Sequence, residues 1–220
     1  MTKILPVIHH MNNELAFIQA TMAKSFKADG IFLISHVGTN DELPNLAQEI
    51  QELLGLKVGL NLLGVDILEA AKVVEEYKLD MVWGDNCGVS SLGLDSKGEE
   101  LSLWKKRNPN IDVFASVAFK YQKVDTNPPL AAKEAQNAGF IPTTSGSGTG
   151  YAPSLEKIIA MSNVVDNQLA VASGMDCENV HHFKDYLSHI LVATGISKNE
   201  NEFDVDKMSR FFEIVRHKNN

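Results

Sequence analysis

The sequence contains only two cysteines, Cys87 and Cys177, which are far apart and outside any Cys-x-x-Cys pattern. This spacing indicates neither a disulfide framework nor a zinc site, and we expect no metal and no other cofactor. Long apolar runs are also missing. No segment approaches the roughly 18 apolar residues of a membrane span, and the apolar run before His9 is too short for a signal peptide. We therefore predict a cytoplasmic protein without membrane contact.

Clusters of lysine and arginine are absent as well. The chain has 20 Lys and Arg against 28 Asp and Glu, which gives a net charge of -8. Binding to nucleic acid requires clustered cations that neutralise phosphates, so no nucleic-acid partner is expected. The 220 residues are enough for one large α/β domain or two small ones. No linker or low-complexity segment divides them, which favours a single domain over residues 1–220.

Apolar segments with strand character alternate with segments of helical periodicity along the whole chain. The predicted strands are residues 4–8, 30–37, 57–63, 81–85, 112–120, 140–144, 169–173 and 189–194. Predicted helices cover 15–26, 42–54, 66–77, 99–106, 127–138, 154–165, 177–186 and 205–216. In the first helix, Leu15, Ile18, Met22 and Phe26 are expected to share the buried face. Asp66, Asn127 and Ser154 are expected to cap the helices that they begin.

Eight strand-helix units at this length predict a closed (β/α)8 TIM barrel. The strands are too apolar to have a wet face, which is typical of a parallel sheet covered by helices. A doubly wound open sheet is the alternative. That fold usually places its glycine-rich loop after the first strand, whereas here the loop follows the sixth.

The glycine-rich loop after the sixth predicted strand, SGSGTG, indicates a phosphate site. Its glycines allow close approach of the backbone to a ligand, and its hydroxyls add donors beside the amides. The seventh and eighth strands also end in a hydroxyl residue followed by glycine, where barrels of this kind commonly hold phosphate. Compact turns that need glycine for packing are the alternative interpretation. The candidate ligand-binding residues here are Ser145, Gly146, Ser147, Gly148, Thr149, Gly150, Ser173, Gly174, Thr194 and Gly195.

Other predicted strand ends carry residues suited to acid-base chemistry. His9, Asp85 and Lys120 are the candidate catalytic residues, and His36, Asn61 and Asn86 are further candidates for ligand contact. A lysine at the end of an apolar strand has its pKa lowered by desolvation, which suits a Schiff-base or electrostatic role. Alternatively, Lys120 extends its amine toward solvent or pairs with Asp85.

Three other patterns are set aside. The glycines at 146, 148 and 150 lack the spacing of a dinucleotide fingerprint, and no Walker lysine follows them. Ser154 and Lys157 match Ser-x-x-Lys, but Ser154 stands where a helix cap is expected. His181 and His182 are adjacent on a predicted helix and point in different directions, so they do not form a metal pair.

Several segments resemble the BtpA/SgcQ family of predicted TIM-barrel enzymes. Three lie in the last third of the chain: TTSGSGTGYAPSLEKI (143–158), ASGMDCENV (172–180) and LVATGISKN (191–199). A fourth, KVGLNLLGVDILEAA (57–71), resembles the family's third strand and retains Asn61 and Asp66. His9 falls on the histidine that ends the family's first strand.

The departures from the family pattern lie where chemistry is expected. Ser35 and His36 replace an acidic residue and Asn, and Trp83 and Asp85 replace Arg and Asn. Lys120 is kept, whereas Ser116, Ala118 and Tyr121 stand in place of an Asp and two histidines. The resemblance therefore implies phosphate binding more firmly than any one reaction. Family members are described as nucleosidase-like or as factors in photosystem I biogenesis.

These observations lead to two functional hypotheses. The first is a TIM-barrel enzyme that acts on a small phosphorylated metabolite, a sugar phosphate or a nucleotide, by lyase, isomerase or nucleosidase-like chemistry. The second is a diverged, non-catalytic barrel that binds a ligand or a partner protein as an assembly or biogenesis factor. A homodimer is a weak expectation, because exposed faces of barrel helices often pair.

Overall fold

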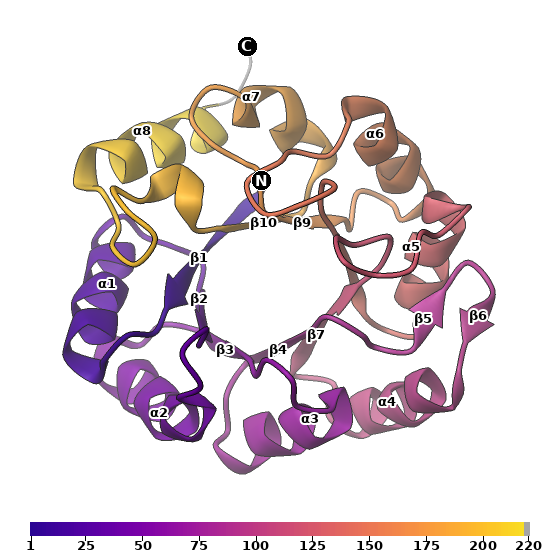
Figure 1. The fold of residues 1–220 in the computed structure, drawn as a ribbon, viewed down its shortest axis with the longest axis horizontal. Helices are drawn as coiled ribbons and strands as arrows, with labels where there is room; N and C mark the ends of the chain where they lie inside the picture. Colours follow the sequence, from indigo (N-terminus) through magenta and orange to yellow (C-terminus); the bar gives the residue numbers. More distant parts are fainter. Residues whose placement is uncertain (218–220) are drawn as a thin grey trace.

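The computed structural model describes residues 1–217, and these form a closed barrel of eight parallel strands surrounded by helices (Figure 1). The barrel strands are β1 (Lys3–His9), β2 (Ile31–Ile34), β3 (Val58–Asn61), β4 (Met81–Gly84), β7 (Asp112–Ser116), β8 (Ile141–Thr144), β9 (Ala170–Ala172) and β10 (His189–Val192). β1 closes the barrel by pairing with β2 on one side and β10 on the other. The predicted (β/α)8 fold is confirmed.

Helices follow the barrel strands around the outside of the barrel, so the colours in Figure 1 run once around the ring. The helices are α1 (Asn13–Ser25), α2 (Leu43–Leu54), α3 (Ile67–Glu76), α4 (Ser96–Arg107), α5 (Pro128–Asn137), α6 (Leu155–Val164), α7 (Val180–Phe183) and α8 (Val205–Arg216). Short 3-10 segments occur at Asn40–Glu42, Lys184–Tyr186 and Thr194–Ile196. No helix among residues 1–217 combines the length and the apolar character needed to cross a bilayer.

Alternation along the strands divides the apolar residues between two cores. Ile31 and Leu33 of β2 belong to the outer core against the helices, whereas Phe32 and Ile34 belong to the core inside the barrel. The inner core includes Phe114, whose ring centroid lies 5.2 Å from that of Phe32. Because both faces of each strand are buried, the strands have no wet side.

Side-chain caps begin most of the helices, and the three predicted ones are confirmed. Asp66 accepts a hydrogen bond from Leu68 N, Asn127 from Leu130 N and Ser154 from Lys157 N. Asp95 caps α4 in the same way, so this helix begins at Ser96, earlier than predicted.

Two predictions about helices were wrong. In α1, Ile18 is 52% exposed, and the buried positions are instead Ala16, Gln19, Ala20 and Ala23. The small alanines belong to the outer core and allow the helix backbone to approach β1 closely, so the large side chains remain at the margin of the contact. The segment predicted as helix 177–186 forms only the single turn of α7 and a 3-10 turn, because an Asx-type turn at Asp176 occupies its beginning.

The fifth predicted strand is shorter than expected, which matters for the site. β7 ends at Ser116, so Lys120 lies in the following loop rather than on the strand. The residues between the predicted strand 81–85 and the predicted helix 99–106 contain a hairpin of β5 (Val89–Ser90) and β6 (Gly93–Leu94), which packs outside the barrel near α5.

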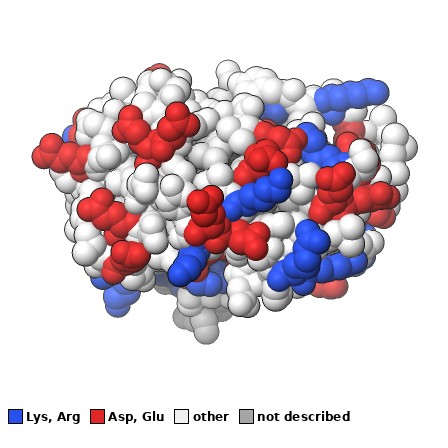
Figure 2. All heavy atoms as spheres, turned by 90° about the horizontal axis from the view of Figure 1, so that it is seen from below, with Lys and Arg blue, Asp and Glu red and all other residues white. Residues whose placement is uncertain are grey.

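Charges of both signs are interspersed on the side of the molecule that carries α2, α3 and α4 (Figure 2). Lys97 pairs with Asp66 at 2.8 Å, and Lys72 pairs with Glu69 at 2.6 Å, both between exposed or half-buried side chains. Such surface pairs contribute little to stability, so this surface is not what holds the barrel together.

Candidate functional site

A cavity of about 320 Å³ opens at the carboxyl ends of the barrel strands. Its floor is apolar and includes Val7, Ile34 and Leu191, together with the rings of Trp83 and Phe119. Nine of the residues predicted to form the site line this cavity: His9, His36, Asn61, Asp85, Lys120, Thr149, Ser173, Gly174 and Thr194. The fold thus brings all three candidate catalytic residues to one mouth, although their roles remain predictions.

Histidines from β1 and from the loop after β2 meet at this mouth. The His9 and His36 ring centroids are 4.9 Å apart in an edge-to-face arrangement. His9 Nδ1 lies 2.9 Å from the carbonyl oxygen of Glu200, which can only accept, so Nδ1 donates and Nε2 carries the lone pair of the neutral ring. Burial lowers the pKa of His9, and the neighbouring His36 lowers it further.

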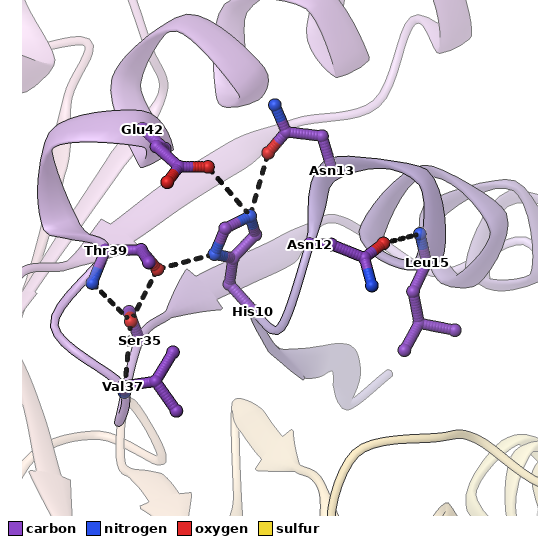
Figure 3. A network of polar contacts seen from close by, with 8 residues as sticks. All are labelled: His10, Asn12, Asn13, Leu15, Ser35, Val37, Thr39 and Glu42. Atoms are coloured by element: carbon purple, nitrogen blue, oxygen red, sulfur yellow. Dashed lines mark hydrogen bonds and ion pairs between the residues drawn. The ribbon is translucent and has the colours of Figure 1, made fainter.

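The loop that carries His36 is held by the polar network in Figure 3. His10, which is 1% exposed, lies with Nε2 2.8 Å from Asn13 Oδ1 and with Nδ1 2.7 Å from Thr39 Oγ1. Thr39 Oγ1 is also 2.8 Å from Ser35 Oγ, which accepts hydrogen bonds from the backbone of Thr39 and Val37. The second histidine of the His9-His10 pair is therefore structural, and it fixes the turn after β2.

Lys120 extends from the loop after β7 toward the loop after β8. Its backbone N–H donates to Ser145 Oγ at 2.8 Å, and its Nζ donates to Thr149 Oγ1 at 3.2 Å. Burial lowers the pKa of Lys120, while Tyr121 and Asp85 act in the opposite direction. Within residues 1–217 no ion pair joins Lys120 to the exposed Asp85, so the alternative in which Lys120 pairs with Asp85 is not observed.

The turns after β8, β9 and β10 also meet at the mouth. Gly150 N donates to Ser173 Oγ at 3.0 Å, and Ser173 has a φ of 85°, a left-handed conformation that is strained for serine. A Cβ on Gly174 would overlap the backbone of Tyr151 and Ala152, and one on Gly195 would overlap the carbonyl oxygen of Met175. Close packing therefore requires glycine at these two positions, which agrees with the alternative interpretation of compact turns.

The other predicted ligand-binding residues lie around this cavity rather than in it. Gly195 and Gly150 line a neighbouring cavity of about 470 Å³ between the β9 and β10 turns and α8, which Gly174 and Thr194 also border. Asn86 borders the grooves on the far side of Asp85. Ser145 is buried, and its hydroxyl serves the backbone of Lys120 and Gly146. Gly146, Ser147 and Gly148 line neither of the two cavities.

The match to a family model decides the relationship. The model of the BtpA family matches residues 39–217, which is most of the chain. The chain belongs to the BtpA family. An uncharacterized protein of Methanocaldococcus jannaschii, MJ1115, is 26% identical over 180 residues, which cover 77% of this chain and 69% of that protein.

Solved structures similar to this BtpA-family barrel share its fold. Phosphoribosyl anthranilate isomerase from Thermus thermophilus has a TM-score of 0.67 at 14% identity, covering 97% of this chain and 98% of that one. Orotidine 5'-monophosphate decarboxylase from Methanocaldococcus jannaschii has a TM-score of 0.67 at 12% identity, with the same coverages. At these identities the likeness establishes the TIM-barrel fold alone.

Lys157 of this BtpA-family chain has a role that the sequence did not predict, because the Ser-x-x-Lys match that contains it was set aside. Its Nζ donates to the carbonyl oxygens of Ala118 at 2.6 Å and Ser145 at 2.9 Å, and burial lowers its pKa to about 8. Ala118 has a φ of 46°, so the loop after β7 is strained where Lys157 holds it. Lys157 thereby fixes the loop that carries Phe119 and Lys120.

One signal in the sequence points to Lys157. It lies in the first turn of α6, where the helix dipole disfavours a positive charge unless acceptors are near.

Among residues 1–217, no three His, Cys, Asp or Glu side chains gather as metal ligands would.

Proposed function

We propose that this BtpA-family barrel is an enzyme that acts on a small phosphorylated metabolite, a sugar phosphate or a nucleotide. The observation that carries the proposal is that two kinds of residue line one cavity at the mouth of the barrel. His9, His36 and Lys120 line the same 320 Å³ cavity as the Ser173, Gly174 and Thr194 turns. Groups suited to an anion and groups suited to proton transfer thus face one space.

The phosphate is proposed to lie at the turns after β9 and β10, with the loop after β8 beside it. Burial is the largest cause of the lowered pKa of His9, and His36 and Lys120 lower it further, so the charges around the mouth support an anionic ligand. Electrostatic repulsion among like-charged neighbours is relieved when an anion binds. Thr149 and Ser173 add hydroxyl donors between Lys120 and the turns.

The reacting end of the substrate is proposed to face His9, Lys120 and Asp85. His9 has a lone pair on Nε2 and a lowered pKa, which suits a general base. The ammonium of Lys120 stabilises negative charge that develops on the substrate, and Asp85 orients a hydroxyl or acts as a base. Lyase, isomerase and glycosyl-bond reactions each need such a set.

The phosphate site can be tested by calorimetry with ribose 5-phosphate and with ribose. We expect the phosphate ester to bind at least tenfold more tightly. Thr194→Glu should remove this preference, because it places a carboxylate at the proposed phosphate position. Val205→Glu is the matched control: it adds the same charge at a 54% exposed position on α8 and should leave binding unchanged. Equal binding of the two compounds would contradict the proposal.

Turnover is tested separately by mass spectrometry on mixtures of phosphosugars and nucleotides. His9→Gln and Lys120→Met should remove product formation while affinity for the consumed compound changes less than tenfold. If phosphorylated compounds bind and none is converted, the protein is the non-catalytic barrel of the second hypothesis.

A further inference from the structure

Asn61, at the end of β3, has a buried amide without a partner. The residue is 3% exposed and lines the mouth cavity. Within residues 1–217, four buried side-chain atoms lack a hydrogen-bond partner: Gln19 Nε2, Asn40 Oδ1, Gln51 Oε1 and Asn61 Nδ2. Of these four residues, Asn61 is the one that borders the mouth cavity. An unmade buried hydrogen bond costs about 1–3 kcal/mol, so a donor kept in such a position calls for an acceptor.

The walls next to Asn61 are apolar and aromatic. Trp83 and Phe119 are 7% and 6% exposed, and their ring centroids are 6.2 Å apart in an edge-to-face arrangement. Trp83 Nε1 already donates to Ser116 Oγ at 3.0 Å, so the indole has no free donor for a ligand. Val7, Ile34 and Leu63 complete this part of the lining.

A sugar phosphate alone does not match this surface. Its hydroxyls would lose water against Trp83 and Phe119 without gaining partners, which costs free energy. A planar apolar ring gains from the same burial, and the edge of such a ring can bring an acceptor to Asn61. The charged residues Asp85 and Lys120 line the cavity from the loops after β4 and β7, so the floor itself favours an uncharged group.

We propose that the floor of the mouth, formed by Asn61, Trp83 and Phe119, is a ring subsite. It binds an uncharged planar ring whose edge oxygen or nitrogen accepts a hydrogen bond from Asn61 Nδ2. This inference rests on the proposed function for the position of the phosphate and deepens it. The substrate is then a nucleotide-like compound, with a ring on the floor and a phosphate at the turns after β9 and β10.

Calorimetry with matched ligands tests the subsite. The probes are uridine 5'-monophosphate and adenosine 5'-monophosphate, compared with ribose 5-phosphate, which lacks the ring. We expect at least one nucleotide to bind tenfold or more tightly than ribose 5-phosphate. Asn61→Leu should remove that gain and leave ribose 5-phosphate binding within twofold. Both nucleotides binding no better than ribose 5-phosphate, or a gain that survives in Asn61→Leu, would overturn the proposal.

A second readout separates this proposal from the phosphate site. In a Trp104→Phe background, Trp83 reports on the floor, and uridine or adenosine should change its fluorescence without any phosphate. If phosphorylated sugars fail to bind but a nucleoside changes the Trp83 signal, the proposed function fails and the ring subsite stands. If neither nucleoside changes it, the ring subsite is wrong. Asn61→Leu should also melt no lower than the parent, because an unpaired buried donor is replaced by an apolar side chain of similar size.

Discussion

Each end of the barrel has a cavity lined by at least one histidine, but the two cavities differ in how their polar groups are arranged. The larger cavity, about 680 Å³, lies at the amino ends of the strands and is bordered by His189. His189 has its Nδ1 2.8 Å from Ser188 Oγ and its ring 5.2 Å from Phe114. At the carboxyl ends, the smaller cavity gathers two histidines, a lysine and an aspartate.

Cavity size alone does not distinguish the two ends of the barrel. Both His9 and His189 have a lowered pKa, with burial as the largest cause in each case. The side chain of His189 is fixed in the wall, with Lys3 and Lys57 as its charged neighbours, whereas His9 faces other titratable groups across a cavity. In TIM barrels the carboxyl ends carry chemistry and the amino ends stability, which agrees with this difference.

The largest effect is expected from His189. Burial lowers its pKa to about 3, so between pH 3 and about 6.5 the unfolded chain binds a proton that the folded chain does not. Stability therefore falls as the pH drops through this window, by about 3 kcal/mol between pH 6.5 and pH 4. Urea unfolding of the parent and of His189→Leu at a series of pH values should show a shallower acid dependence in the variant.

The matched control for this experiment is His9→Gln, at the other end of the barrel. His9 is only half-buried, so its removal should change the acid dependence less than the removal of His189. An unchanged slope in His189→Leu would show that the two histidines are not distinguished by burial.

The sequence predicted the barrel because its information is local. The apolar strands, the caps at Asp66 and Asn127 and the hydroxyl-glycine turns can be read without knowing which strands are neighbours. The strand ends meet at one mouth in any such barrel, so His9, Asp85 and Thr194 could be placed there. Ile18 was misplaced because periodicity favours large apolar residues, whereas the close contact of α1 with the strands selects small ones.

What could not be predicted depends on contacts between loops. Lys157 acts through the carbonyl groups of Ala118 and Ser145, which reach it only in the folded chain. The end of β7 could not be predicted either, because the residue with the left-handed conformation after it is Ala118 rather than a glycine. The unpaired amide of Asn61 is a property of its surroundings, not of its residue type.

Lys157→Met is expected to have the next largest effect. Two hydrogen bonds from a charged amine are lost, and the carbonyl of Ser145 loses a buried donor, which together should cost about 2 kcal/mol in unfolding free energy. The loop with Lys120 should also loosen, so ribose 5-phosphate should bind more weakly. Urea unfolding and calorimetry measure both effects.

Lys97→Met is the control for Lys157→Met. It removes a cation from the surface pair with Asp66, in a groove beside the mouth cavity rather than in it, and should cost less than about 1 kcal/mol. Equal losses in the two lysine variants would mean that Lys157 is not holding the loop.

The smallest effect is a change in the protonation of His9, and it compares the two ends of the barrel within one sample. Binding of ribose 5-phosphate brings negative charge to a mouth where burial, and then His36 and Lys120, lower the pKa of His9. The anion stabilises the imidazolium, so the pKa of His9 should rise on binding. Histidine resonances followed by NMR against pH, with and without the ligand, measure this shift. His189 lies at the far end of the barrel and should not respond. A change in the pKa of both histidines would indicate a change in the whole barrel. A change in neither pKa would show that the anion does not bind at the mouth.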